Sequence, residues 1–322
     1  MPEVRPLPYE KKGVAMGRTR LICIIFMLLG IARIGLAESK FLTDQVGLNQ
    51  SEVTYASNYP IILHHGVFGF KKILILEYFY KVPETLRNLG YEVFVTKVDP
   101  VGSIAERSKQ LGAQIDEILR ITGKDKVNII AHSMGGLDSR YLVSELGYQD
   151  KIASVSMIST PNRGSYIADI VVSAFGAHKK VRDAVLNLIG VPKKKGLIAK
   201  ALEAISNNSE KFLAKFNERI SNNAAVYYQS WAGVTSARAE NSRSKADKVG
   251  PLFFIPYWIL KKRNGNNDGL VTVDSARWGH YRGMIPADHL DQVGFWWGAT
   301  SPKYRHLLFF QKIASELARK GF

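Results

Sequence analysis

The surroundings of Ser133 have the residue types and the order that a nucleophilic serine needs. Such a serine stands on a turn between a strand and a helix, and this turn is so tight that the positions two before and two after must be small. Ala131 and Gly135 meet that requirement, although alanine stands where glycine is common. The apolar run 127–131 predicts the strand, and 136–146 predicts the helix. We therefore expect Ser133 to be a nucleophile; the alternative is a serine that caps the following helix.

A serine hydroxyl becomes an effective nucleophile only when a base takes its proton, and a carboxylate must orient that base. After a serine on such a turn, the acid comes first along the chain and the histidine second. His289 is the candidate base because it lies in a segment with no helix or strand pattern of its own, and His280 is the alternative. His178 lies among lysines and His306 begins the last helix, so we expect both to be solvated or structural.

Asp268 is the candidate acid. It lies in a turn, Asn266-Asn267-Asp268-Gly269, that is followed by an apolar pair before the candidate base. Asp274 is the alternative acid, whereas Asp288 is adjacent to the base in sequence and is poorly placed to reach across its ring. A turn aspartate that only bonds its own backbone is the structural alternative for Asp268.

Negative charge that develops on a carbonyl oxygen needs preset donors, each typically worth about 2.7–4 kcal/mol. One donor is the backbone N–H of the residue after the nucleophile, here Met134. The loop that follows the apolar strand 61–63 supplies the second, the N–H of Val67. His64 and His65 precede the serine, so we expect them to shape this loop by hydrogen bonds and not to act as bases.

The elements that must position these residues alternate along the chain. Short apolar runs predict strands, and amphipathic runs that end at glycine predict helices. The alternation is typical of a mostly parallel sheet with helices on both faces. In chain order the sequence predicts a strand at 61–63, a helix at 83–90, a strand at 91–96, a helix at 103–123 that starts with a capping box, a strand at 127–131, a helix at 136–146, a strand at 152–159 and, after an insertion, a strand at 225–232 and a helix at 304–319.

A helical insertion interrupts this alternation at about 165–220. It has no strand signal, and apolar residues recur in it at helical spacing at 181–189 and at 198–205. Lysines surround both stripes, so the insertion is amphipathic and basic. We expect this insertion to form a helical cap over Ser133, a segment that can open and close as a lid does. The alternative for the stripe at 181–189 is ordinary packing against the core.

The composition excludes a disordered or fibrous chain and leaves a basic globular protein. The 322 residues hold 44 Lys and Arg against 28 Asp and Glu, a net charge of +16, and 46% of the residues are hydrophobic. Such a surplus attracts the phosphates of nucleic acid or an anionic membrane surface. No nucleic-acid-binding motif is present, so we expect no nucleic-acid partner.

The first 37 residues have the layout of a secretory signal peptide. Basic residues precede an apolar run at 21–32, which holds the one cysteine, and small residues predict cleavage after Ala37. The run is shorter than the roughly 20 residues of a spanning helix, which favours a cleaved signal over an uncleaved membrane anchor. A start at Met16 would give a signal of ordinary length. The product, 38–322, is then a single secreted or periplasmic domain without cysteine.

Over about residues 57–310 the chain resembles the secreted bacterial triacylglycerol lipases of the pseudomonad and Proteus type, within the α/β-hydrolase superfamily. The most specific part of the likeness is the pairing of Asn-Asp-Gly-Leu-Val at 267–271 with His-Leu-Asp at 289–291. Six segments carry the resemblance: 59–70, 77–80, 126–136, 159–165, 267–271 and 288–293.

The resemblance implies an α/β-hydrolase fold with a mostly parallel central sheet, helices on both faces and an inserted helical cap. It also implies a lipase or esterase that hydrolyses carboxylic esters of lipids through an acyl-enzyme intermediate. By that resemblance Ser133, Asp268 and His289 form the catalytic triad, and the backbone N–H groups of Val67 and Met134 form the oxyanion hole.

The resemblance further implies a structural calcium ion near the histidine, while the chemistry itself needs no cofactor. Asp291, two residues after the histidine, matches one calcium-binding aspartate, and Asp247 matches the other by its spacing from the acid. The family's two carbonyl ligands would fall near Phe295 and Ala299. Carboxylate and carbonyl oxygens are the ligands that Ca²⁺ prefers.

We expect a lipid or ester substrate at a lipid–water interface and transient contact with a membrane surface. The insertion is richer in lysine than the family pattern, and position 131 is alanine where the family has glycine. These departures from the family pattern leave the length of the substrate's acyl chain open. A short-chain carboxylesterase, phospholipase, thioesterase or polyester depolymerase would share this site. A noncatalytic binding protein of the same fold is the alternative outside the enzymes. The need for a lipase-specific foldase and the oligomeric state are left open by the sequence.

Overall fold

The computed structural model of the protein describes residues 57–69, 72–73, 76–177, 195–236, 247–300 and 303–322. These residues belong to one compact unit, Gly47–Phe322. The predicted signal peptide at 1–37, the stripe at 181–189 and His178 lie outside the described residues. Within the described part, no helix combines the length and the apolar character needed to cross a membrane.

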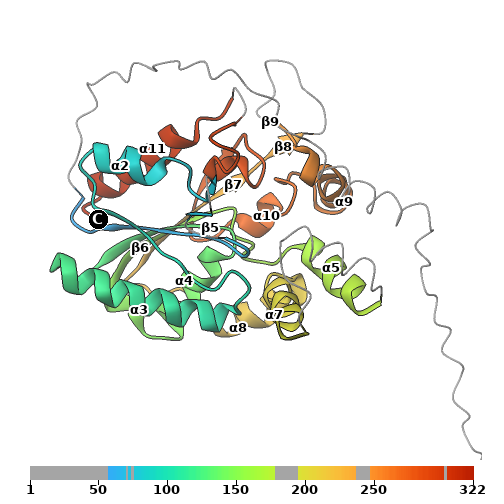
Figure 1. Ribbon diagram of the computed structural model, residues 1–322, viewed down its shortest axis with the longest axis horizontal. Coiled ribbons are helices and arrows are strands. Elements are labelled where there is room, and N and C mark those ends of the chain that lie inside the picture. The colour runs from blue at the N-terminus through green and yellow to red at the C-terminus, as the bar shows by residue number, and fades with distance from the viewer. Residues whose placement is uncertain (1–56, 70–71, 74–75, 178–194, 237–246, 301–302) are drawn as a thin grey trace, which may run out of the picture. The chain divides into compact units, whose positions relative to one another are not determined.

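A six-stranded parallel sheet forms the centre of the fold (Figure 1). The three central strands are buried along their whole length, which explains why they read as continuous apolar runs. Every neighbouring pair of strands runs parallel, as the alternation of strands and helices predicts. Across the sheet the order is β10 (His280–Ile285), β7 (Tyr227–Gly233), β6 (Ile152–Ile158), β5 (Val127–His132), β1 (Ile61–His64) and β4 (Val93–Val95).

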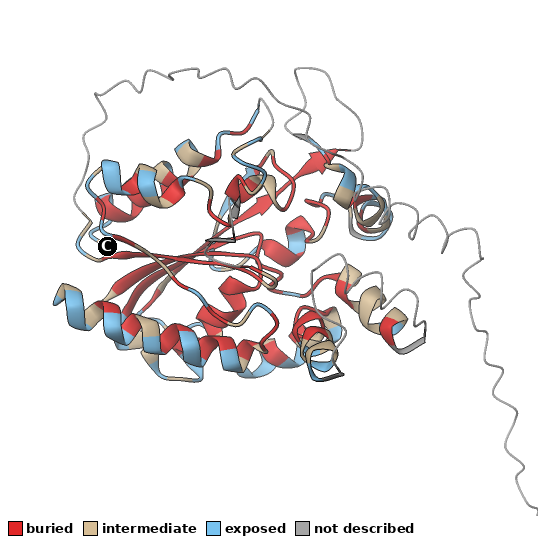
Figure 2. Ribbon diagram, viewed as in Figure 1, coloured by how far each residue is buried: buried red, intermediate tan, exposed pale blue. Residues whose placement is uncertain are grey.

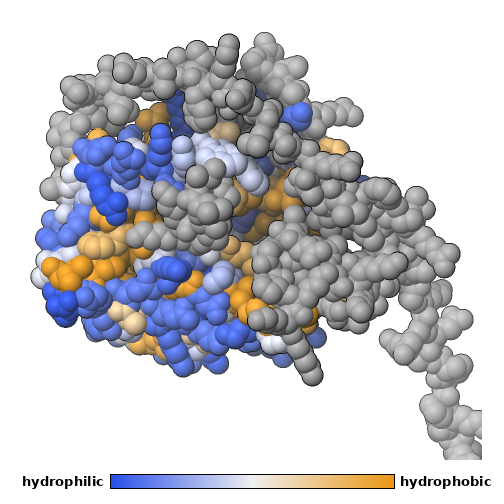
Figure 3. All heavy atoms as spheres, viewed as in Figure 1, coloured by the Kyte–Doolittle hydropathy of each residue, from blue (hydrophilic) through white to orange (hydrophobic). Residues whose placement is uncertain are grey.

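Helices cover both faces of this sheet. In Figure 1, α2 (Val82–Asn88) and α11 (His306–Arg319) lie above the sheet, and α3 (Ile104–Thr122) and α4 (Gly135–Ser144) lie below it. Each face has its own hydrophobic core, because alternate residues of a strand point to opposite faces. Figure 2 shows the buried residues along the sheet and on the inner sides of these helices. In Figure 3 hydrophilic residues cover the outer surfaces of α2 and α3.

The helix α3 begins and ends where the sequence predicts. The Ser103 hydroxyl accepts a hydrogen bond from the Glu106 N–H, and the Glu106 carboxylate accepts one from the Ser103 N–H. This is the predicted capping box. Gly123 ends the helix in the left-handed conformation, with φ +66°, which glycine adopts without a steric cost.

The insertion is helical, as predicted, and forms a cap of three described helices. These are α5 (Tyr166–Ala177), α7 (Lys195–Ser206) and α8 (Glu210–Arg219), and no strand occurs in the described part of the insertion. The stripe predicted at 198–205 buries Ala201 and Ile205 in a small core shared with α5.

The sequence did not predict the edge strand β10. Its residues alternate between exposed and half-buried, so no apolar run marks it. The apolar stretch 252–260 forms a 3-10 turn, Pro251–Phe253, and the helix α9 (Phe254–Asn264). The described part also contains short elements: the strand pair β2 (Lys72–Ile73) and β3 (Leu76–Glu77), the strand pair β8 (Thr235–Ser236) and β9 (Asp247–Lys248), and the helix α10 (Val273–Ala276).

Candidate active site

Ser133 stands on a strained turn between β5 and α4. Its φ is +56°, a left-handed conformation that costs a residue other than glycine about 1–3 kcal/mol. Its N–H donates to the carbonyl of Ile158 (2.9 Å), which ties the turn to β6. Ala131 is fully buried, and a Cβ atom on Gly135 would lie 2.8 Å from the carbonyl oxygen of His64. The crowding therefore explains why the sequence has small residues at both positions.

The structure brings three of the predicted residues into one hydrogen-bonded chain. His289 Nε2 lies 2.9 Å from Ser133 Oγ, and His289 Nδ1 lies 2.8 Å from Asp268 Oδ2. The carboxylate accepts the Nδ1–H, so Nε2 carries the lone pair that accepts the serine hydroxyl. A neutral imidazole in this tautomer is placed to take a proton from the serine.

Asp268 is fully buried and its carboxylate accepts four hydrogen bonds. The donors are His289, the N–H groups of Leu270 (2.9 Å) and Val271 (2.7 Å), and the side-chain amide of Gln292 (2.9 Å). Burial alone raises the pKa of Asp268, but the imidazole and the N–H donors outweigh it, so the pKa lies below its ordinary value. Sequence reasoning missed Gln292, whose only signal is its position three residues after His289.

The alternative residues lie elsewhere. Asp274 is exposed on α10 and lies 3.9 Å from Arg277, and His280 begins the strand β10 and stacks on the Tyr227 ring. Asp288 is buried, but it accepts only backbone N–H groups and does not bond to the ring of the neighbouring histidine. Burial raises the pKa of Asp288. The hydrogen-bonded chain to Ser133 therefore contains Asp268 and His289.

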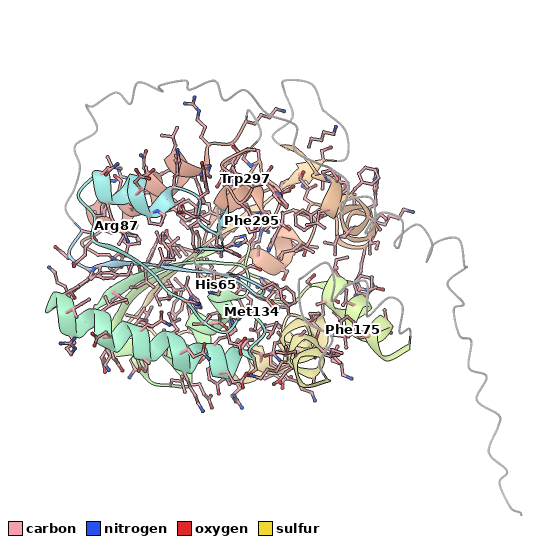
Figure 4. All side chains as sticks on the ribbon, in the orientation of Figure 1. His65, Arg87, Met134, Phe175, Phe295 and Trp297 are labelled. Atoms are coloured by element: carbon pink, nitrogen blue, oxygen red, sulfur yellow. The ribbon has the colours of Figure 1, made fainter. Side chains whose placement is uncertain are left out.

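The loop that carries Val67 lies directly against the nucleophile. A Cβ atom on Gly66 would lie 2.7 Å from the Ser133 Cβ, so only glycine allows this approach. Among the described residues, neither the Val67 N–H nor the Met134 N–H has an acceptor, and the two side chains share one small core. In Figure 4, His65 of this loop and Met134 lie close to each other near the middle of the molecule.

Tyr78 holds the loop from its other side, a contact that the sequence analysis did not predict. The Gly66 N–H donates to the Tyr78 hydroxyl (3.1 Å), and this hydroxyl lies 2.7 Å from His132 Nδ1. The His132 ring packs on the His289 ring with 4.7 Å between centroids. Burial lowers the pKa of His132 far below its ordinary value, so it stays neutral beside the candidate base.

A buried ionic network lies behind the same loop. His64 Nε2 donates to Asp138 Oδ2 (3.0 Å), which also accepts from Arg107 Nε (2.8 Å). A second Arg107 N–H donates to the carbonyl oxygen of His65 (2.7 Å). The His64 and His65 side chains are buried, in agreement with the prediction that they shape the loop and are not bases.

The two aspartates predicted to bind calcium lie on a short strand and just after His289 in sequence. Asp247 belongs to β9, and Asp291 begins a 3-10 helix, Asp291–Val293. The Gly250 N–H donates to Asp288 (3.0 Å), which joins the chain after β9 to this loop. In the described part of the chain, no three His, Cys, Asp or Glu side chains converge as a metal site. An ion here would need backbone or water oxygens as well, which Ca²⁺ accepts.

The sequence is similar to a known family over most of its length. The family described as "alpha/beta hydrolase fold" matches residues 59–302. The chain belongs to the α/β-hydrolase family. The hydrolase is 35% identical over 273 residues to triacylglycerol lipase 2 of Saccharomyces cerevisiae, covering 79% of this chain and 77% of that protein. It is 29% identical over 301 residues to the triacylglycerol lipase of Vibrio cholerae, covering 85% of this chain and 90% of that protein.

The comparison with solved structures agrees with the α/β-hydrolase fold. The crystal structure of the Bacillus licheniformis lipase BlEst2 in its mature form superposes with a TM-score of 0.61 at 19% identity, covering 83% of this chain and 93% of that one. This likeness supports the predicted α/β-hydrolase fold with its mostly parallel sheet. The sequence relatives and the family match make the protein a lipase or esterase, as predicted.

Proposed function

We propose that this hydrolase cleaves the carboxylic esters of lipids, triacylglycerols among them, with Ser133, His289 and Asp268 as its catalytic triad. The hydrogen-bonded chain from the serine through the imidazole to the buried carboxylate carries the proposal. The relatives from yeast and Vibrio cholerae are named triacylglycerol lipases, which supports a triacylglycerol as the substrate.

The proposed reaction follows from the hydrogen bonds that join Ser133, His289 and Asp268. His289 Nε2 takes the hydroxyl proton as Ser133 Oγ forms a bond to the ester carbonyl carbon. Asp268 holds the ring in the correct tautomer and stabilises the imidazolium, and does not itself take up the proton. The C–O bond to the alcohol then breaks, and the alcohol leaves with the proton from the imidazolium. A water molecule releases the fatty acid from the acyl-enzyme by the same two steps.

The oxyanion formed in each step lies between the N–H groups of Val67 and Met134 in this proposal. Both groups lack an acceptor among the described residues, so each is free to donate to the substrate oxygen. Neither donor has to break another hydrogen bond first, which is the meaning of a preorganised oxyanion hole.

Calcium is a structural part of the proposal and takes no part in the chemistry. Asp247 and Asp291, with the carbonyls of Phe295 and Ala299, would hold the ion beside the loop that positions His289. Bound calcium would stabilise that loop. We expect a chelator to lower the melting temperature of the wild type and to leave that of Asp291→Asn unchanged. Equal melting curves of the wild type with and without the chelator would contradict a calcium site.

Export and interfacial action belong to the same proposal. A cleaved signal peptide at 1–37 would place the enzyme outside the cytoplasm, where it meets lipid aggregates. The cap 165–220 would act as a lid that opens on contact with them. N-terminal sequencing of the exported protein tests the cleavage after Ala37.

The decisive assay compares wild type with Ser133→Ala on dissolved short-chain p-nitrophenyl esters and on an emulsified triacylglycerol. We expect Ser133→Ala to lose at least about a thousandfold in kcat on both. The matched control is Ser144→Ala, an exposed serine at the end of α4, which should keep wild-type rates. Equal rates for wild type and Ser133→Ala would refute the triad, and activity confined to the dissolved esters would make the protein an esterase.

A further inference from the structure

The helix α9 has an exposed stripe that takes no part in the proposed chemistry. Phe254 and Trp258 are 42% and 41% exposed, although both are large and apolar. They are four residues apart and therefore lie on one face of the helix, and Lys261 continues that face one turn later. The face thus consists of two aromatic rings followed by a positive charge.

The exposure is a fixed property of the helix, because the neighbouring face, about 100° around the helix axis, is firmly packed. Phe253, Tyr257 and Leu260 are 5%, 4% and 0% exposed at the same spacing. The carboxyl end of the helix is also held, since the Arg263 guanidinium lies 2.8 Å from Glu210 and 3.8 Å above the Tyr166 ring. The helix therefore cannot turn its aromatic face inward without losing these contacts.

The helix lies between the candidate active site and the cap. At one end the Phe253 ring, just before α9, meets the His289 ring edge-on at 6.3 Å between centroids. At the other end Arg263 contacts Tyr166 of α5, the first helix of the cap. Figure 1 shows α9 beside α5, and the two helices are in contact. Whatever binds the exposed face of α9 is therefore held next to the site.

The charges of α9 favour an anionic partner. The helix has no acidic residue and ends in Lys261-Lys262-Arg263. Lys261 donates to the Asn266 side chain (2.9 Å), and neither Lys261 nor Lys262 forms an ion pair with a described carboxylate. Basic residues at a helix end also interact favourably with its dipole, but that effect does not explain two exposed aromatic rings.

We propose that the exposed face of α9 docks the protein on a lipid surface that carries anionic headgroups. Phe254 and Trp258 enter the boundary between headgroups and acyl chains, and Lys261 and Lys262 stay at the level of the phosphates. A second copy of the chain fits this face poorly, because the chain is strongly basic, with a net charge of +16 over its full sequence, and a copy would bring lysines against lysines. The purpose of the docking rests on the proposed lipid hydrolysis, whereas the docking itself does not.

The test measures binding of the full chain with Ser133→Ala, which leaves the lipids intact, to vesicles of phosphatidylcholine alone or mixed equally with phosphatidylglycerol. We expect tighter partition onto the mixed vesicles. Phe254→Ala with Trp258→Ala should weaken it about tenfold. Lys261→Gln with Lys262→Gln should weaken it about twentyfold on the mixed vesicles and leave binding to phosphatidylcholine unchanged.

Matched controls lie on α3 and just after it. Lys109→Gln with Lys124→Gln removes the same charge from exposed positions, and Ile121→Ala removes an apolar side chain that is 55% exposed. Both should bind within about twofold of the parent. A site-specific readout is quenching by brominated lipids, which should fall in Trp258→Phe and stay unchanged in Trp278→Phe.

Equal binding of the α9 variants and their controls would overturn the proposal, as would equal quenching in Trp258→Phe and its parent. Self-association that the aromatic substitutions abolish would identify a second copy as the occupant and would also overturn it. The same α9 substitutions in the active chain should leave hydrolysis of dissolved short-chain esters unchanged. If the active chain does not hydrolyse these esters at all while vesicle binding follows α9, the proposed function fails and the docking stands.

Discussion

Two buried pairs of aspartate and histidine in this protein look alike but have different surroundings. His289 Nδ1 lies 2.8 Å from Asp268, and His64 Nε2 lies 3.0 Å from Asp138. Both carboxylates are fully buried. The first pair continues to the Ser133 hydroxyl. A buried pair of aspartate and histidine is therefore not enough to indicate a catalytic site, because only one of the two pairs contacts a serine hydroxyl.

The difference lies in what the remaining atoms of each pair bind. Asp138 also pairs with the buried Arg107, and the second nitrogen of His64 bonds to Thr96 (2.8 Å), so both ring nitrogens are engaged in the core. Asp268 has only neutral donors besides His289, whose second nitrogen faces the nucleophile. The Asp138 pair belongs to a buried ionic network in which both nitrogens of the histidine are bonded within the core. In the Asp268 pair the second nitrogen lies against the Ser133 hydroxyl, where it is placed to take a proton.

The largest expected effect is on catalysis at the first pair. Asp268→Asn should lower kcat about ten-thousandfold, because the amide no longer selects the tautomer in which Nε2 accepts the serine proton. Steady-state hydrolysis of a dissolved ester measures it. Asp274→Asn, the exposed alternative acid, is the control and should keep wild-type kcat. A greater loss in Asp274→Asn than in Asp268→Asn would reverse the assignment.

The corresponding change at the second pair should act on stability. Asp138→Asn leaves the Arg107 charge buried without a carboxylate and should lower the free energy of unfolding by about 3–5 kcal/mol. Chemical denaturation measures this change, and kcat per folded molecule should fall less than about tenfold. A loss of kcat as large as that of Asp268→Asn, with stability unchanged, would show that the two pairs are not functionally different.

A smaller effect should appear in the pH dependence of stability. Burial lowers the pKa of His64 despite its bond to Asp138, so the unfolded chain binds more protons than the folded one as pH falls below about 6.5. The free energy of unfolding should therefore decrease as the pH is lowered in this range. His64→Gln should make that fall shallower by up to about 1.4 kcal/mol per pH unit. A slope in His64→Gln equal to that of the wild type would contradict the lowered pKa of His64.

Local patterns were enough to predict the central strands, the helices on both faces and the turn at Ser133. Each depends on residues close in sequence, such as the capping box at Ser103 or the small residues around the serine. The candidate acid and base could be proposed from the sequence because both lie in loops after Ser133, in the order that such a turn requires. The comparison with known proteins agrees with the predicted family and fold.

What the sequence could not predict depends on distant contacts. The Tyr78 hydroxyl meets Gly66 and His132 only after the sheet has formed, and Asp138 lies 31 residues from Arg107 and 74 from His64. Nothing in the order of these residues indicates that they meet. The strand β10 was missed because an edge strand with one exposed face has no apolar run.

The most direct test of the triad is labelling with a fluorophosphonate, which reacts with a serine only when a neighbouring base activates it. Peptide mapping by mass spectrometry should find one adduct per chain, on the peptide that contains Ser133. The labelling rate should fall in Asp268→Asn and stay unchanged in Asp274→Asn. An adduct on a different serine, or hydrolysis that continues undiminished after Ser133 is fully labelled, would contradict the account.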